Sequence, residues 1–171
     1  IVDRQDINLF EEDAGGTGDT VQSTVSFRLD VNFENLFLIG SAKASATGNA
    51  VGNDIHGNAA NNTLRGLGGE DFLLGGKGND LLFGGSGADV FVFQDDCGHD
   101  TVRDFSANGA GHDLLSLIDL SAIHDFSDRM KHHVEQHHGD VVIDAGHGDI
   151  ITLDDVSKGQ LHESNFIFMT T

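Results

Sequence analysis

The sequence predicts an all-β protein organised around a parallel β-solenoid, and three observations lead to this prediction. Glycines recur every nine residues, each glycine opens a unit whose sixth residue is Asn or Asp, and the eighth residue of every unit is apolar. A fixed period indicates one supersecondary unit stacked on itself. The glycines that open the units are Gly48, Gly57, Gly66, Gly75 and Gly84.

Each unit divides into a turn and a short strand. The last three units read GLGGEDFLL, GGKGNDLLF and GGSGADVFV over residues 66–92, and GNAVGNDIH and GNAANNTLR over 48–65 are weaker copies. Glycine permits the positive φ values of a tight turn, and the strand that follows places one side chain inward. Two units make a coil of about 18 residues, and coils stack at about 4.8 Å. The predicted core column is Ile55, Leu64, Leu73, Leu82 and Phe91.

The sixth position of each unit suggests a ligand. The loop of one unit lies beneath the loop two units later, so carbonyl oxygens and side-chain oxygens of two turns face one another. Calcium takes six to eight oxygen ligands from carboxylates and backbone carbonyls. The stacked loops therefore fit Ca²⁺, and the sixth column is Asn53, Asn62, Asp71, Asp80 and Asp89.

This nonapeptide resembles the calcium-binding repeat of RTX (repeats-in-toxin) proteins. The resemblance implies a calcium-binding parallel β-roll like the C-terminal domain of serralysin-like, type I-secreted bacterial exoenzymes. It implies about three calcium ions, within a range of roughly two to six. The metal-site residues that it implies are Asn53, Asn62, Gly66, Gly68, Gly69, Asp71, Gly75, Lys77, Gly78, Asp80, Gly84, Ser86, Gly87, Asp89, Asp100, Asp104 and Asp113.

The resemblance also implies how these residues pair. Asp71 is expected to pair with Asp89, and Asp80 with Asp100 after a two-residue insertion. Asp104 and Asp113 follow the family's Asp-Phe and Gly-x-Asp ending of the roll. Sites at Asn53 and Asn62, which carry one charge less, are expected to be weaker or empty.

The flanks predict two caps. We expect capping strands over 1–45, the β-roll over 46–92, and a C-terminal cap with a type I secretion signal over 93–171. Within the last segment, 3–4 spacing of apolar residues predicts a helix over 119–136, and a hairpin follows over 140–144 and 149–153. The apolar end 165–168 resembles the C-terminal tail of proteins exported by type I secretion.

Composition limits the partners. The 171 residues carry 28 acids against nine Lys and Arg, for a net charge of −19. Such a chain does not bind nucleic acid by neutralising phosphates, and no apolar run is long enough to insert in a membrane. Self-repulsion opposes folding unless metal supplies the free energy. Cys97 is the single cysteine, so no internal disulfide forms, and the chain is expected to be a monomeric C-terminal piece of a longer protein.

The cluster at 132–138 is a rival site. His133 and His137 are four residues apart and would share a helix face at a zinc-binding spacing, but Val134 stands where a zinc protease has Glu. A solvated helix face is the favoured interpretation, and adventitious zinc or nickel binding is the alternative. The role of this cluster is left open.

The sequence thus predicts a non-catalytic extracellular calcium module. It would fold on calcium binding after passing the type I secretion machinery, and it would nucleate folding of an N-terminal catalytic or effector domain. The alternative is a polysaccharide- or substrate-binding module that assists a companion secreted enzyme, namely a metalloprotease, lipase, glycanase or alginate epimerase. A basic or aromatic stripe on one face would favour that alternative, but the sequence shows none, and the net charge of −19 argues against an anionic polysaccharide unless bound calcium bridges it.

Overall fold

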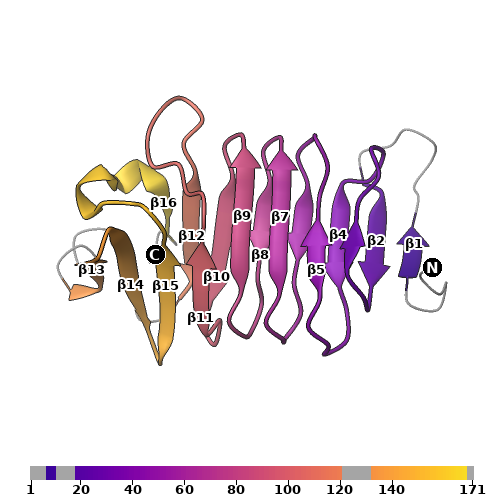
Figure 1. Ribbon diagram of the computed structural model, residues 1–171, viewed down its shortest axis with the longest axis horizontal. Coiled ribbons are helices and arrows are strands. Elements are labelled where there is room, and N and C mark those ends of the chain that lie inside the picture. The colour runs from indigo at the N-terminus through magenta and orange to yellow at the C-terminus, as the bar shows by residue number, and fades with distance from the viewer. Residues whose placement is uncertain (1–6, 11–17, 121–131, 169–171) are drawn as a thin grey trace.

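The computed structural model describes residues 7–10, 18–120 and 132–168, and strands and turns make up nearly all of them. Two sheets face each other along the length of the molecule, and the chain alternates between them as it advances (Figure 1). The first sheet contains, in spatial order, β1 (Ile7–Phe10), β2 (Thr20–Ser23), β4 (Asn35–Leu38), β6 (Asp54–His56), β8 (Phe72–Leu74), β10 (Val90–Gln94), β12 (Leu114–Asp119) and β16 (Phe166–Ile167). The second contains β13 (Val134–His137), β14 (Asp140–Gly146), β15 (Asp149–Leu153), β11 (His99–Val102), β9 (Leu81–Ser86), β7 (Thr63–Gly68), β5 (Ser45–Thr47) and β3 (Phe27–Arg28).

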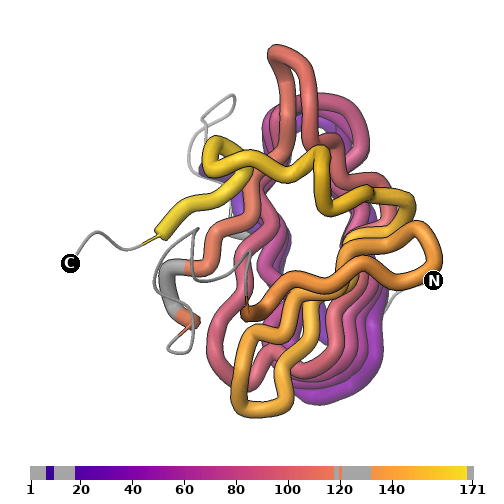
Figure 2. Tube along the Cα trace, turned by 90° about the vertical axis from the view of Figure 1, so that its left-hand side faces the viewer, coloured from indigo at the N-terminus to yellow at the C-terminus, as the bar shows by residue number. Residues whose placement is uncertain are grey.

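The register between strands follows the sequence period. Asp54 pairs with Phe72 and Phe72 with Val90, so the steps from β6 to β8 and from β8 to β10 in the first sheet are 18 residues each. In the second sheet Thr63 pairs with Leu81 at the same spacing. All of these pairings are parallel, and the view along the solenoid shows the coils superimposed around a flattened interior (Figure 2). The predicted parallel β-solenoid is confirmed.

The core is a column of single residues, one from each strand. The predicted members Ile55, Leu64, Leu73, Leu82 and Phe91 are all fully buried. The column continues into both caps, where burial extends it through Val21, Leu36, Ala46, Val102, Leu115, Ile151 and Leu153. Because every coil contributes to one continuous core, a coil gains its stability from its neighbours rather than from its own contacts.

The C-terminal cap closes the roll with antiparallel strands. The predicted hairpin forms as β14 and β15, and β15 then joins β11 in parallel, so the hairpin continues the second sheet. The chain ends by adding β16 to β12 in the first sheet, after 3₁₀ turns at Lys158–Gln160 and Glu163–Asn165. The cap is therefore built into both sheets.

The predicted helix over 119–136 is wrong at both ends. Asp119 ends strand β12, and residues 134–136 belong to strand β13, which pairs with β14. Residues 121–131 lie outside the described part of the chain. The spacing of Met130 and Val134 suggested one apolar helix face, but Val134 instead packs into the core from a strand with the pattern of one buried and three exposed residues.

Candidate metal sites

Two ladders of acidic side chains run along the turns of the roll. In ladder 1, the backbone N–H of Asn53 donates to Asp71 Oδ1 at 2.8 Å, that of Asp71 to Asp89 Oδ1 at 2.9 Å, and that of Asp89 to Asp113 Oδ1 at 3.0 Å. In ladder 2, the N–H of Asn62 donates to Asp80 Oδ1 at 2.7 Å and that of Asp80 to Asp100 Oδ1 at 2.8 Å. Each carboxylate thus holds the coil before it in register through one oxygen.

The second oxygen of three carboxylates has no partner. Asp71 Oδ2, Asp80 Oδ2 and Asp89 Oδ2 are buried and accept no hydrogen bond, and their side chains belong to residues that are 1 %, 3 % and 0 % exposed. A buried acceptor without a partner is costly, and far more so when it carries charge. These three atoms therefore require a proton or a cation.

The surroundings of the three oxygens contain further oxygen atoms. A Cβ placed on Gly66 would overlap Asp71 Oδ2 and would lie 2.6 Å from the carbonyl oxygen of Gly84 in the coil above. A Cβ on Gly75 or Gly84 would likewise overlap the unpaired oxygen of its own unit. The missing Cβ atoms thus leave room for the carboxylate oxygens, and at Gly66 a carbonyl oxygen lies beside them. Carboxylate and carbonyl oxygens are the donor set that calcium takes.

Burial also changes the acidity of these groups. Desolvation raises the pKa of Asp71 to about 7, with a smaller contribution from the charge of Asp89. It raises the pKa of Asp80 to about 6 and that of Asp100 to about 8. Desolvation raises the pKa of Asp89 as well. Without a cation, these carboxylates hold their protons at a pH where an exposed Asp is ionised.

The first two units differ, as their Asn residues predict. Asn53 Oδ1 accepts the N–H of Asn49 at 2.8 Å, and Asn62 Oδ1 accepts that of Asn58 at 2.7 Å. Neither oxygen is left without a partner. The space above these two loops holds a carbonyl as it does elsewhere, that of Gly66 over Gly48 and that of Gly75 over Gly57.

The end of ladder 1 draws on residues beyond the repeats. Asp113 accepts the N–H groups of Asp89 at 3.0 Å and of Ser106 at 2.7 Å, one on each oxygen, and desolvation raises its pKa to about 6. Asp104 accepts the N–H of Gly84 at 3.0 Å. Both candidates therefore stand beside the last loop of the repeats.

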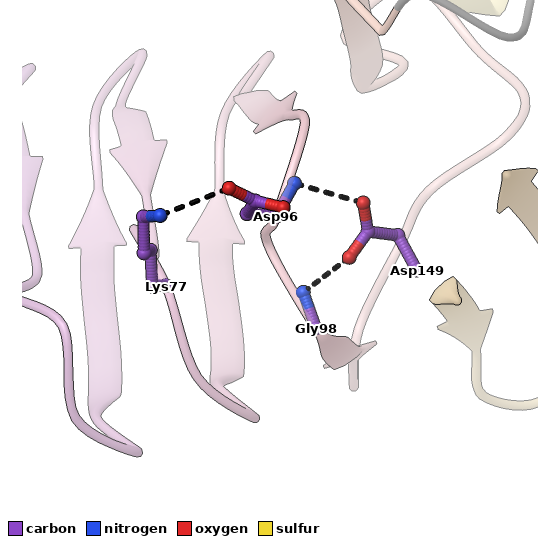
Figure 3. A network of polar contacts seen from close by, with 4 residues as sticks. All are labelled: Lys77, Asp96, Gly98 and Asp149. Atoms are coloured by element: carbon purple, nitrogen blue, oxygen red, sulfur yellow. Dashed lines mark hydrogen bonds and ion pairs between the residues drawn. The ribbon is translucent and has the colours of Figure 1, made fainter. Parts of the chain in front are cut away.

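The end of ladder 2 contains a residue that the sequence analysis missed. Asp149, from the start of β15, accepts the N–H of Gly98 at 2.8 Å on Oδ1 and that of Asp96 at 2.9 Å on Oδ2 (Figure 3). Gly148 and Asp149 are adjacent, whereas Gly69 and Asp71, like the corresponding residues of the next two units, are two apart, so no signal of the repeat marks Asp149 in the sequence. Its two oxygens are both occupied, so it holds the loop after β10 through hydrogen bonds alone.

The remaining predicted residues contribute backbone or surface groups. The ammonium of Lys77 is exposed and pairs with Asp96 at 2.9 Å, so its side chain is directed away from the ladder and only its carbonyl is available to a cation (Figure 3). Ser86 is exposed, and its hydroxyl lies 3.5 Å from the carbonyl oxygen of Leu67. Four predicted glycines shape the turns: Gly68, Gly69, Gly78 and Gly87.

The histidine cluster does not form the predicted helix face. His137 lies in strand β13 and contacts Glu135, whereas His133 precedes that strand and contacts the Asp144 carbonyl. Across residues 7–10, 18–120 and 132–168, no three His, Cys, Asp or Glu side chains converge in a conventional metal site. The zinc spacing in the sequence therefore does not become a zinc geometry, because the chain there is extended.

Comparison with known proteins agrees with this geometry. Residues 56–91 match the family of the RTX calcium-binding nonapeptide repeat (4 copies). These are RTX calcium-binding repeats. The matched segment contains Asn62, Asp71, Asp80 and Asp89 of the two ladders, whereas Asn53, Asp100 and Asp113 lie outside it. No curated protein matches the chain as a whole.

Two solved structures are similar to this chain, and the first shares its fold. The extracellular lipase LipA from Serratia marcescens has a TM-score of 0.54 and 24 % identity, covering 91 % of this chain and 20 % of the lipase chain. The present chain therefore spans about a fifth of the length of that lipase. The AlgE6R3 subunit of the Azotobacter vinelandii mannuronan C5-epimerase has a TM-score of 0.45 and 19 % identity, covering 78 % and 77 % of the two chains.

Proposed function

We propose that this chain is a non-catalytic domain of a larger secreted bacterial protein and that it folds when it binds calcium outside the cell. The observation that carries the proposal is the set of three buried, unpaired carboxylate oxygens at Asp71, Asp80 and Asp89. We assign one calcium ion to each. Each ion would take a carboxylate oxygen and backbone carbonyls from two stacked loops, and it would bind only when both loops are in place.

Folding and calcium binding are then the same event. At a net charge of −19, the chain repels itself until cations neutralise the loops. Ligands that bind only the folded state stabilise it by mass action, and extracellular calcium modules have Kd values of about 10⁻⁴–10⁻³ M. A chain kept unfolded at low calcium can pass an export channel and then fold on the far side.

One observation supports a place in a larger, exported protein. The extracellular lipase has a domain of this fold that makes up a minor part of its chain. No helix among the described residues is long and apolar enough to cross a membrane. The type I secretion machinery and an N-terminal catalytic or effector domain are the partners that this role requires, and the C-terminal segment 93–171 would carry the export signal.

A calcium titration of the metal-free chain tests the proposal. Far-UV circular dichroism should show β-structure appearing cooperatively with calcium and not with the same concentration of magnesium, which prefers a rigid octahedral site. Isothermal titration should give three ions, and Asp80→Ala should lose one of them. A chain that is fully folded in chelator and takes up no calcium would contradict the proposal.

A second candidate function rests on the outer face of the second sheet. Arg28, Arg65 and Arg103 lie in one row across alternate strands. Arg28 and Arg65 both pair with Thr47, on the strand between them. Arg65 also pairs with Phe83, and the pairing of Leu82 with Val102 places Arg103 beside Phe83. The Arg65 guanidinium lies 3.7 Å above the Phe83 ring. This is the basic and aromatic stripe that would favour a polysaccharide-binding module.

The spacing of the stripe suits a linear acidic polysaccharide. Alternate strands are about 10 Å apart, so the row offers cations at a regular interval to an extended polyanion. Two acids reduce its charge, since Arg103 pairs with Asp154 and Arg65 interacts with Asp104. An Arg28→Ala/Arg65→Ala variant should bind polygalacturonate more weakly than Lys77→Ala, which removes a cation from the loop edge. Equal binding by both variants would exclude the stripe as the binding face.

A further inference from the structure

The side-chain amides of the first two repeats bridge neighbouring coils. Asn53 Nδ2 donates to the carbonyl oxygen of Phe33, in the preceding coil, at 3.3 Å, while its Oδ1 accepts the N–H of its own loop. Asn49 extends the same bridge, because its Nδ2 donates to the carbonyls of Asp30 and Phe33, each at 2.8 Å. Two amide nitrogens thus converge on carbonyl oxygens between two turns.

The second repeat copies this arrangement on the opposite edge. Asn62 Nδ2 donates to the carbonyl of Ala44 at 3.3 Å, and Asn58 Nδ2 donates to that of Ala42 at 2.9 Å. The Oδ1 atom of Asn58 accepts the N–H of Ala60 at 2.9 Å, as Asn49 Oδ1 accepts that of Val51 at 3.0 Å. Each pair of asparagines, at the second and sixth positions of its unit, has both of its oxygens occupied as well.

The later repeats lack both amides. Their second position is Leu67, Gly76 or Gly85, none of which has a polar side chain, and their sixth position is an aspartate with an unpaired oxygen. An ionised carboxylate cannot donate to a carbonyl, so in these loops a proton or a cation is needed to join oxygen atoms from two coils. In the first two repeats, the neutral side-chain amides join the two coils by donating hydrogen bonds to these carbonyl oxygens.

We propose that the two asparagine pairs, Asn49 with Asn53 and Asn58 with Asn62, are metal-free clasps. They hold the first coils together by hydrogen bonds where calcium holds the later coils, and they set the point along the solenoid at which calcium binding begins. The first coils therefore form without calcium and provide a folded end on which the calcium-dependent coils assemble. This inference refines the proposed calcium function by fixing where along the roll it acts.

Hydrogen exchange in chelator tests the clasps without reference to calcium. Amides of β5 and β6 should exchange more slowly than those of β8 and β10 by about tenfold or more, because a coil that stays closed protects its amides. Asn53→Ala/Asn62→Ala should remove this difference. Asn61→Ala is the matched control, since it deletes an exposed asparagine that accepts one bond from the N–H of Asn79, and it should preserve the difference. Uniform exchange along the wild-type chain in chelator would overturn the inference.

A conversion experiment tests the other half of the inference. In Asn58→Gly/Asn62→Asp, the second and sixth positions of the second repeat carry the residues that a later repeat has there. Isothermal titration calorimetry should then show one more bound calcium ion than in the wild-type chain. Asn61→Asp adds the same charge in the same loop and should leave the count unchanged. If Asn53→Ala/Asn62→Ala instead lowers the wild-type calcium count, the asparagines are ligands and the clasps do not exist.

The two proposals fail in different ways. A wild-type chain that binds no calcium contradicts the proposed function, and the exchange pattern in chelator still decides the clasps. A chain that binds three ions but exchanges uniformly in chelator retains the function and loses the clasps.

Discussion

The first and the later coils of this solenoid join their stacked turns with different side chains, neutral in the first coils and acidic in the later ones. Both stack turns whose carbonyl oxygens face one another, and both place a polar side chain at the sixth position. In the first coils the side chain is a neutral amide that donates one hydrogen bond and accepts another, as Asn53 and Asn62 do. In the later coils it is a carboxylate that accepts one and leaves an oxygen bare. An exchange of oxygen for nitrogen therefore decides whether a coil depends on metal.

The comparison predicts that the dependence on calcium can be removed by one type of substitution. In Asp71→Asn/Asp80→Asn/Asp89→Asn, Oδ1 can still accept the N–H of the preceding coil while an amide N–H₂ takes the place of each unpaired oxygen. Removing a buried carboxylate such as Asp71, whose pKa is raised from 3.8 to about 7, stabilises the metal-free state by on the order of 4 kcal/mol at a pH above that value. The triple variant should be folded in chelator by circular dichroism and unresponsive to calcium.

A matched control separates this effect from a general loss of negative charge. Asp95, Asp144 and Asp155 are exposed, so replacing all three with Asn makes the same change in net charge without touching a ladder. That variant should keep its calcium dependence. If it too folds in chelator, self-repulsion rather than the unpaired oxygens accounts for the requirement.

Much of this comparison was visible in the sequence, because the period that builds the fold also carries the ligands. A column of apolar residues at the eighth position predicted a core that the structure confirms in Ile55, Leu64 and Phe91. The two-residue insertion before Asp100 was also readable, and Leu81 pairs with Thr101 at a spacing of 20. In a repeat protein, residues at the same position of successive units stack on one another, so the sequence period directly predicts which side chains lie together.

The rest could not be read because it depends on contacts between distant segments. Asp149 meets Gly98 across 51 residues, and no period connects them. The segment around Val134 has apolar spacing that suits a helix, yet pairing with β14 makes it a strand, so tertiary contacts override the local preference. The clasps could not be predicted from the sequence, because their hydrogen bonds depend on which carbonyl lies beneath each Asn. The coil that supplies the carbonyls precedes the repeats and does not follow the nine-residue period.

Acid should act as a weak substitute for calcium in the later coils. The folded-state pKa values of Asp71 (about 7), Asp80 (about 6) and Asp100 (about 8) lie above the ordinary value of 3.8. The folded state therefore binds more protons than the unfolded state between about pH 4 and pH 8, and its stability falls as pH rises through that window. In chelator, far-UV circular dichroism should show more β-structure at pH 5.5 than at pH 8.

In saturating calcium the trend should reverse, because protons compete with the metal for the same oxygens. Circular dichroism at both pH values in chelator, and thermal scans at both in calcium, measure the two trends. A chain whose stability in chelator rises from pH 5.5 to pH 8 would show that these carboxylates are ionised and satisfied without metal, which contradicts the assignment of the sites.

The same Asp-to-Asn change should have the opposite sign at the end of ladder 2. Asp149 uses both of its oxygens to accept N–H groups, from Gly98 and Asp96, so an amide there would set its own N–H₂ against a donor. Hydrogen bonds to a charged group contribute about 1.5–3 kcal/mol. Asp149→Asn should therefore lower the free energy of unfolding in calcium by about 2 kcal/mol while leaving the number of bound ions at the wild-type value. A loss of one ion would instead identify Asp149 as a ligand.

The smallest effect is expected at the second position of the first aspartate unit. Leu67 has φ of 86°, in the left-handed region that Gly76 and Gly85 occupy at the same position of the next two units, with φ of 94° and 109°. A non-glycine residue there is strained by about 1 kcal/mol, and the Leu67 side chain is 40 % exposed, so its removal loses little packing. Leu67→Gly should raise the free energy of unfolding in calcium by a few tenths to about 1 kcal/mol, as measured by urea denaturation. Leu67→Ala, which shortens the side chain but keeps its Cβ, separates the two causes: it should give no gain, and an equal gain in both variants would assign the effect to the exposed side chain instead of the backbone.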